Sequence, residues 1–220
     1  MTLEKSPILD QVLSLNTQKP VVFFLFFVMG MGANWVAASA MFQEVPYLEV
    51  ILPEGLCISA SINAAVNTSI LFVFAYIKLG GQDFIPNTYM IPCILMSGSV
   101  ACFFAALLFR VKVLGISLFL FFGALLGGIT GAMTSVVITP WLMRYRRNLI
   151  SATRGGGSFA VLLCGVVAHF QHPDQTPPVF SAETYLCIFG CLLVLPLFAY
   201  RAIMQLNVGL IEEIEVRDED

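Results

Sequence analysis

Charged residues are scarce in this chain of 220 residues, because Asp, Glu, Lys and Arg together make up only 11% of it. A soluble domain of this length is nearer a quarter charged. The chain therefore cannot cover a globular surface of its own size with charge. This shortage excludes a soluble enzyme, a nucleic-acid-binding module with a basic face and a disordered regulator. The net charge of −3 likewise gives no electrostatic reason to expect a polyanionic partner such as nucleic acid.

Motifs that carry chemistry are also lacking. The sequence has no CxxC pair, and its six cysteines lie mostly inside apolar runs, where a thiol behaves as a small hydrophobic side chain. It contains no metal-ligand cluster and no phosphate-cradling loop, so we expect neither a metal nor a cofactor. Ser158 and His169 share one predicted helix, but they lie roughly 16 Å apart along its axis. This distance is too long for a nucleophile and its base, so the sequence does not predict an enzyme.

Long apolar runs, in contrast, are abundant: 58% of the residues are hydrophobic. A membrane-spanning helix needs roughly 20 mainly apolar residues, and six stretches meet this requirement. They are Val21–Gln43, Leu56–Ile77, Tyr89–Phe109, Val113–Leu142, Leu149–Phe170 and Ala182–Met204. The sequence thus predicts an all-α integral membrane protein, a six-helix bundle over residues 21–204. A cytoplasmic N-terminal segment (1–20) precedes it, and an acidic cytoplasmic tail (205–220) follows it.

The positions of the cations predict the orientation of this bundle. With the N-terminus inside, nine of the eleven Lys and Arg residues fall in segments at the cytoplasmic end, and only Arg110 and Lys112 fall outside. Cytoplasmic loops carry an excess of Lys and Arg. Both termini are therefore predicted to lie in the cytoplasm.

Polar residues inside the second span lie on one face. Ser59, Asn63 and Asn67 follow one another at intervals of four residues, the spacing of a helix face. Amides in hydrocarbon are costly unless they meet a partner or water. We therefore expect this face to point inward, either to a ligand or to interhelical hydrogen bonds, and the sequence leaves both alternatives open.

Small residues and a proline mark the fourth span. Gly123, Gly127 and Gly131 recur every four residues, which favours close helix packing over substrate contact. Pro140 is expected to loosen the helix near its inner end. Helices with these features are more typical of a moving membrane carrier than of an inert anchor.

The first span and the segment after it hold the most specific pattern. Taken alone, Trp35 reads as a packing aromatic, and Glu44 as a solvated helix end. The order Trp35, small residues, Phe42, Glu44, Pro46 and then Leu-Pro-Glu-Gly at 52–55 resembles the animal-type riboflavin transporters. These are solute carriers, distantly similar to the major facilitator superfamily.

Later segments extend this resemblance. Thr134-Ser135 through Pro140 is similar to the end of the family's fourth helix. The start of its fifth helix is matched by Arg147, Leu149, Ser151, Gly155 and Gly157. Ser39, Phe42 and Gly156 stand where the family has Asn, Trp and Gln.

The resemblance implies a multi-pass plasma membrane carrier that moves riboflavin or a related vitamin-like compound by alternating access. It implies that Trp35 and Phe42 supply aromatic surface for a planar ring, and that Glu44 accepts hydrogen bonds from the ligand. Further ligand hydrogen bonds would come from Ser39, Asn63 and Asn67. Close helix packing that still allows sliding would come from Gly127, Gly131, Gly155 and Gly157.

Length separates the chain from this family. The family has about eleven helices in two bundles with the substrate between them, whereas this chain resembles the N-terminal half. A homodimer, a separate second transporter half and a truncated gene product each account for the difference. The alternative function is a non-transporting membrane bundle that binds or regulates a full-length transporter.

Overall fold

The computed structural model describes residues 20–112, 117–172 and 178–206. The predicted N-terminal segment and acidic tail lie outside the described residues, apart from Pro20, Gln205 and Leu206. All regular elements of the described part are helical. They are α2 (Pro20–Gly32), α3 (Val36–Gln43), α4 (Val45–Ile51), η1 (Gly55–Cys57), α5 (Ile58–Thr68), α6 (Ile70–Lys78), η2 (Gly81–Asp83), α7 (Asn87–Leu108), α8 (Leu118–Met133), η3 (Thr134–Ile138), α9 (Thr139–Leu142), α10 (Arg147–Gln171), α11 (Ala182–Leu192) and α12 (Leu195–Gln205).

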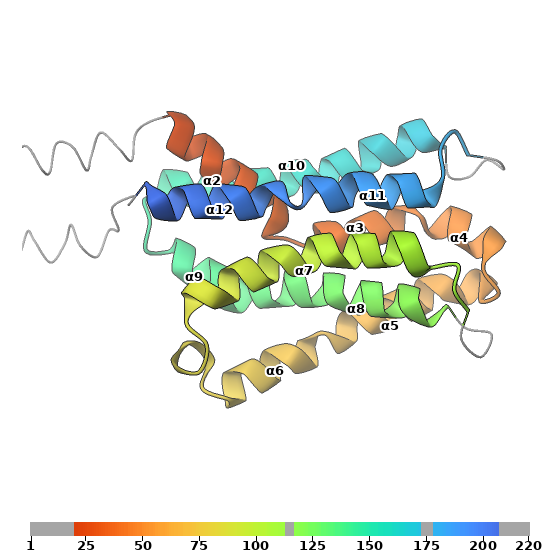
Figure 1. Ribbon diagram of the computed structural model, residues 1–220, viewed down its shortest axis with the longest axis horizontal. Coiled ribbons are helices and arrows are strands. Elements are labelled where there is room, and N and C mark those ends of the chain that lie inside the picture. Colours follow the sequence, from red (N-terminus) through yellow and green to blue (C-terminus); the bar gives the residue numbers. More distant parts are fainter. Residues whose placement is uncertain (1–19, 113–116, 173–177, 207–220) are drawn as a thin grey trace, which may run out of the picture.

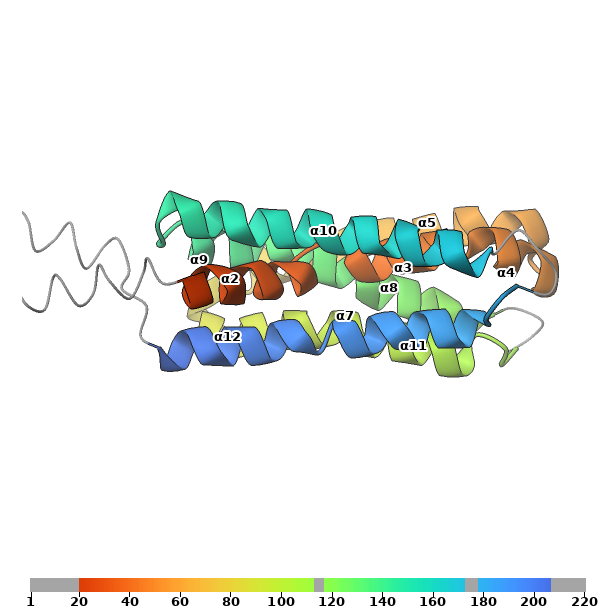
Figure 2. The same ribbon diagram turned by 90° about the horizontal axis from the view of Figure 1, so that it is seen from above.

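These helices run side by side in an elongated bundle (Figure 1). Five helical stretches of the described part are long and apolar enough to cross a membrane, and the bent pair α2 and α3 makes a sixth if it counts as one span. The five are Gly55–Lys78, Asn87–Leu108, Leu118–Leu142, Arg147–Gln171 and Ala182–Gln205. The predicted all-α integral membrane class is confirmed. The start of α2 and the end of α12 lie at the same end of the bundle (Figure 2).

The first span is broken in its middle. The axes of α2 and α3 differ by 53°, and the residues between them, Ala33 to Trp35, are not helical. The Asn34 side chain accepts a hydrogen bond from the Trp35 backbone N–H (2.8 Å), a local bond that competes with the helical one. The prediction of a continuous helix over Val21–Gln43 is therefore wrong at this point.

The fourth span is also irregular, around Thr134–Ile138. A π-helical turn, η3, follows α8, and Pro140 lies in the first turn of α9 directly after it. Proline has no N–H to donate to the preceding turn, and a π turn accommodates one extra residue in the helical ladder. The backbone of this span therefore changes its hydrogen-bonding pattern where Thr134 and Ser135 lie.

Glycines bring several helices into close contact. A Cβ atom built on Gly123 would lie 3.1 Å from the Ala105 Cβ atom, and one on Gly127 would lie 3.1 Å from the Ala38 backbone nitrogen. On α10 the closest approach falls on Gly156, which lies against the Phe27 carbonyl oxygen, rather than on the exposed Gly155. The fourth span thus packs closely on α7 and α3, while α10 packs closely on α2.

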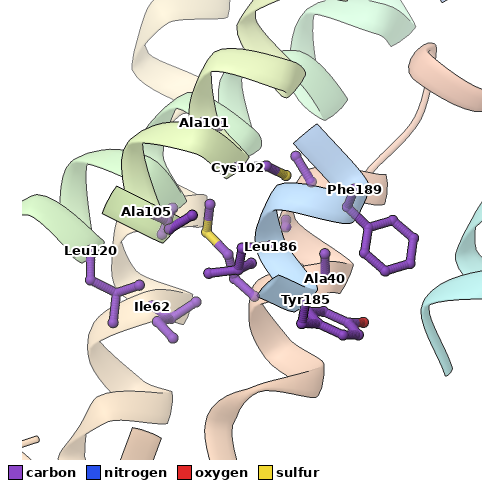
Figure 3. Close-up of a cluster of buried hydrophobic side chains, with 14 of the residues drawn as sticks. Ala40, Ile62, Ala101, Cys102, Ala105, Leu120, Tyr185, Leu186 and Phe189 are labelled. Atoms are coloured by element: carbon purple, nitrogen blue, oxygen red, sulfur yellow. The ribbon is translucent and has the colours of Figure 1, made fainter. Parts of the chain in front are cut away.

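Two apolar clusters fill the bundle. One includes Ala40, Cys102, Tyr185, Leu186 and Phe189, from α3, α7 and α11 (Figure 3). The other is rich in aromatic rings. Its rings include Phe26, Trp141, Tyr145 and Tyr200, and the Trp141 and Tyr145 centroids are 4.9 Å apart. These clusters hold α2, α3, α7, α8 and α11 together and leave the outer surfaces of the helices to other contacts.

Candidate substrate site

Three of the predicted binding residues lie on one face of α3 and at its N-terminus. Trp35, Ser39 and Phe42 are spaced by four and three residues, which places them on a common helix face. Trp35 is 39% exposed and Phe42 is 36% exposed, and Ser39 is half-buried. The Trp35 ring lies directly against Gly131 of α8, where a Cβ atom would collide with it. The aromatic face is thus positioned by a glycine and stays open on its other side.

Asn63 and Asn67 lie on the exposed face of α5. Their side chains are joined by a hydrogen bond from Asn67 Nδ2 to Asn63 Oδ1 (3.1 Å). The prediction that this face points inward is wrong for the bundle described here. The reason is that α5 buries its opposite face, including Ile62 and Val66, and that Gly128 of α8 approaches the Val66 backbone closely.

The helix α10 presents a polar face as well. Arg147, Ser151, Arg154 and Ser158 recur at intervals of four and three residues, and all four are exposed. Figure 2 shows α5 and α10 along one side of the bundle, with α7, α11 and α12 along the other. Both helices on this side of the bundle, α5 and α10, therefore carry exposed polar side chains.

A cavity of about 620 Å³ lies where α10 meets the break in the first span and the π turn. Its size falls within the range of roughly 300–1,000 Å³ that suits drug-sized ligands. Polar groups line much of it: Asn34, Thr134, Ser135, Thr139, Arg147, Ser151, Thr153, Arg154 and Ser158. No Asp or Glu is among its lining residues, so the two guanidinium groups give it a positive character.

The break in the first span adds backbone groups to this region. The last carbonyls of α2 and the first N–H groups of α3 lack the partners that a continuous helix would give them. Asn34 lies in the break, and its Nδ2 atom would be 2.7 Å from a Cβ atom on Gly157 of α10. Discontinuous helices that line a cavity are a recurring feature of transporter binding sites.

Glu44 differs from the other predicted binding residues in being buried. Its side chain is fully buried between α3 and α4, where Gln171 Nε2 donates a hydrogen bond to its Oε2 atom (3.2 Å). The interpretation of Glu44 as a solvated helix end is therefore wrong. Glu44 follows the last residue of the first span, and burial raises the pKa of its carboxyl to about 7.

Glu54, in the Leu-Pro-Glu-Gly segment, holds the start of α8. Its carboxylate accepts hydrogen bonds from the backbone N–H of Ser117 and from the Ser117 hydroxyl (3.1 Å). Ser117 is the residue just before α8, whose first N–H groups have no helical partners. The Leu-Pro-Glu-Gly segment thus ties the second span to the fourth.

Sequence reasoning missed several cavity residues. Asn34, Arg154 and Ser158 were not assigned to the site, although the spacing of Arg147, Ser151, Arg154 and Ser158 on one helix face was visible in the sequence. An arginine inside a predicted membrane span is a signal of its own, because such residues are rare there and mark functional sites.

A family model for solute carrier family 52, the riboflavin transporters, matches residues 18–176. The chain belongs to this family. The match extends from α2 to beyond the end of α10, so it includes the cavity and the aromatic face of α3. Membership supports membrane transport of a riboflavin-type substrate by a multi-pass membrane protein, and the family comprises carriers rather than enzymes. No curated protein and no solved structure matches the chain significantly.

Proposed function

We propose that this chain moves riboflavin, or a related vitamin-like compound, across the plasma membrane by alternating access. The observation that carries the proposal is the polar cavity at the broken first span, within the part of the chain that matches the family. A gap in a helix beside a cavity of suitable size gives a ligand both hydrogen-bonding groups and a backbone that can bend.

The chemistry of the cavity fits a flavin. A flavin has a planar ring with carbonyl acceptors and a hydroxylated side chain. The two guanidinium groups donate to carbonyl oxygens, and the hydroxyls of Ser151 and Ser158 bond with the ligand hydroxyls. Trp35 and Phe42 offer ring faces for stacking. Ser39, Asn63 and Asn67 extend the hydrogen-bonding surface. Glu44 is buried, so it would reach a ligand only after a movement that exposes its side chain.

The exposed polar side suits contact with a second helical bundle. Amides and an arginine that face lipid are costly, so we place this side against a water-filled space whose far wall is another bundle. A second copy of the chain and a separate transporter half both meet this description. The excess of Lys and Arg in the segments at the end where α2 begins and α12 ends supports a cytoplasmic position for this end of the bundle.

The same polar side also suits the second candidate function, a non-transporting bundle that binds or regulates a full-length transporter. The two functions differ in what the chain does when no other riboflavin carrier is present. A carrier raises uptake by itself or as a homodimer, whereas a regulator changes uptake only through its partner.

Uptake of labelled riboflavin into cells that lack riboflavin import tests the proposal. We expect uptake above the empty vector, and a reduction of about tenfold in Trp35→Ala. Phe198→Ala is the matched control, because it truncates another exposed aromatic (62% exposed), which belongs to α12 and does not line the cavity. Uptake no higher than the vector, with the protein confirmed at the cell surface, would exclude transport by this chain alone. Altered uptake on co-expression with a full-length relative would then favour the regulator.

A further inference from the structure

Four helical segments meet around Glu44. They lie at one end of the bundle, opposite the end at which α2 begins and α12 finishes. Glu44 joins α3 to α4, Gln171 is the last residue of α10, and Glu183 lies in the first turn of α11. Arg110, just beyond α7, binds Glu183 through an ion pair of 2.6 Å. This corner therefore links segments that are more than 120 residues apart in the chain.

The corner holds buried oxygen atoms without donors. Glu44 and Gln171 are both fully buried. Gln171 Nε2 donates to Glu44 Oε2 and to the Phe180 carbonyl oxygen, both at 3.2 Å. The Oε1 atom of Glu44, the Oε1 atom of Gln171 and the Oε2 atom of Glu183 are buried and have no hydrogen-bond partner within the described residues. Buried polar atoms are rarely left unpaired, because each one costs roughly 1–3 kcal/mol.

A bound proton would supply one of the missing hydrogen-bond donors. An ionised carboxylate only accepts hydrogen bonds, whereas a protonated carboxyl donates one. Protonation of Glu44 would therefore provide a donor in a corner that has too many acceptors. It would also remove the repulsion between the Glu44 and Glu183 carboxylates. In the described part of the chain, no three His, Cys, Asp or Glu side chains form a group that could hold a metal ion.

We propose that Glu44 binds a proton and, with Gln171, forms a latch that holds the α3–α4 corner against the ends of α10 and α11. Loss of the proton leaves a buried carboxylate beside Glu183 and weakens the latch. The proton site is inferred from the corner itself. During transport, this latch would act as a gate or would couple proton movement to substrate movement. Only that role rests on the proposed function.

Other titratable groups lie close to this corner and must be separated from Glu44. Tyr185 and Glu183 belong to α11, and Arg110 is paired with Glu183. His169 and His172, at the end of α10, have ring centroids 5.6 Å apart. The ordinary pKa of histidine, about 6.5, is close to that of the buried Glu44 carboxyl. The double variant His169→Gln/His172→Gln is therefore the reference background.

Infrared difference spectroscopy of the full chain in lipid vesicles measures the proton directly through the C=O stretch of a protonated carboxyl group. We expect a band that titrates with a midpoint of about 7, persists in the double histidine variant and disappears in Glu44→Gln. Glu49→Gln is the matched control and retains the band. Absence of the band at pH 6, or its persistence in Glu44→Gln, would overturn the proposal. A midpoint that falls strongly as sodium is added at constant ionic strength would also overturn it, because a metal cation would then occupy the site.

Thermal melting gives a second measurement that does not depend on transport. The Glu44 pKa is raised from 4.5 in the unfolded chain to about 7 in the folded one, so folding favours the protonated form. This stabilisation is fully present below about pH 4.5 and is lost as the pH rises through 7. The wild-type Tm should therefore fall between pH 5 and 9, whereas Glu44→Gln, which keeps a neutral side chain, should show a clearly smaller decrease. An equal decrease in both proteins would contradict the latch.

Discussion

The two sides of the bundle differ in what they expose. On the side of α7, α11 and α12, the middle turns expose apolar residues such as Val100 (45% exposed), Ile188 and Phe198. On the side of α5 and α10, the corresponding turns also expose polar residues, Asn63, Asn67, Ser151, Arg154 and Ser158, beside apolar ones such as Phe159 and Leu162. All of these residues belong to helices with the length and composition of membrane spans. The amino-acid composition of a helix identifies it as a membrane span. The residues on its exposed face indicate whether lipid, water or protein surrounds that face.

This difference gives each side its own environment. Apolar side chains such as those of α7, α11 and α12 are compatible with contact to lipid, and we expect lipid on this side. The side of α5 and α10 needs water, ligand or protein, because amides and guanidinium groups in hydrocarbon are costly. The cavity opens among residues of the polar side. A carrier needs a polar side of this kind beside its apolar side. An inert membrane anchor does not.

Thiol labelling in intact membranes should show the largest difference between the two sides. In a Cys57→Ser background, a charged, membrane-impermeant thiol reagent should modify Asn63→Cys. The native Cys93 of α7 and Cys191 of α11 should stay unmodified, although both are exposed on the surface of the bundle, because lipid excludes the reagent. Mass spectrometry of the purified protein measures each modification. Equal labelling of all three thiols would abolish the distinction between a lipid side and an aqueous side.

Removal of a charge should give the next largest effect. Arg154→Gln takes one of the two guanidinium groups from the cavity, and hydrogen bonds to charged groups contribute roughly 1.5–3 kcal/mol. Riboflavin uptake should therefore fall by about tenfold or more. Arg201→Gln removes an exposed cation from α12, on the other side, and should change uptake less than twofold. Similar losses in both variants would assign Arg154 to orientation in the membrane rather than to the site.

Placing a polar residue on the apolar side, or an apolar residue on the polar side, should give smaller effects. These effects should appear as changes in Tm. Val100→Asn places an amide on the lipid side at a cost of about 1–3 kcal/mol and should lower the Tm by several degrees. Asn63→Leu should leave the Tm within about two degrees while it lowers uptake. Thermal melting in lipid nanodiscs, with uptake measured in parallel, tests both. A wild-type Tm for Val100→Asn would mean that this side is not solvated by lipid.

Apolar run length predicted most of the spans accurately, because a membrane helix must be apolar over its whole length. The predicted fifth span, Leu149–Phe170, corresponds to Arg147–Gln171, and the predicted sixth, Ala182–Met204, corresponds to Ala182–Gln205. The break at Ala33–Trp35 was not predicted. Those residues interrupt no apolar run, and the bend results from local hydrogen bonds and from packing against α10.

The candidate site was less predictable, for two reasons. Periodicity identified a polar face on α5 but could not give its direction, which depends on where Ile62 and Val66 find a partner. The contact between Glu44 and Gln171 joins positions 127 residues apart, and no local pattern indicates it. Resemblance to the family indicated Trp35 as a binding residue. It identified Arg147 and Ser151 as motif residues without assigning them to the site, and only the folded chain placed Asn34 opposite Gly157.

The close approach of α2 to α10 has a mechanical consequence. Gly30 lies against the Thr153 backbone and Gly156 against the Phe27 carbonyl, so the two helices touch backbone to backbone at two successive turns. Because either helix would clash with the other at one of these contacts, we expect α2 and α10 to move together. A change of angle at the break Ala33–Trp35 would then turn α3, and with it the Trp35 and Phe42 rings, relative to this pair of helices.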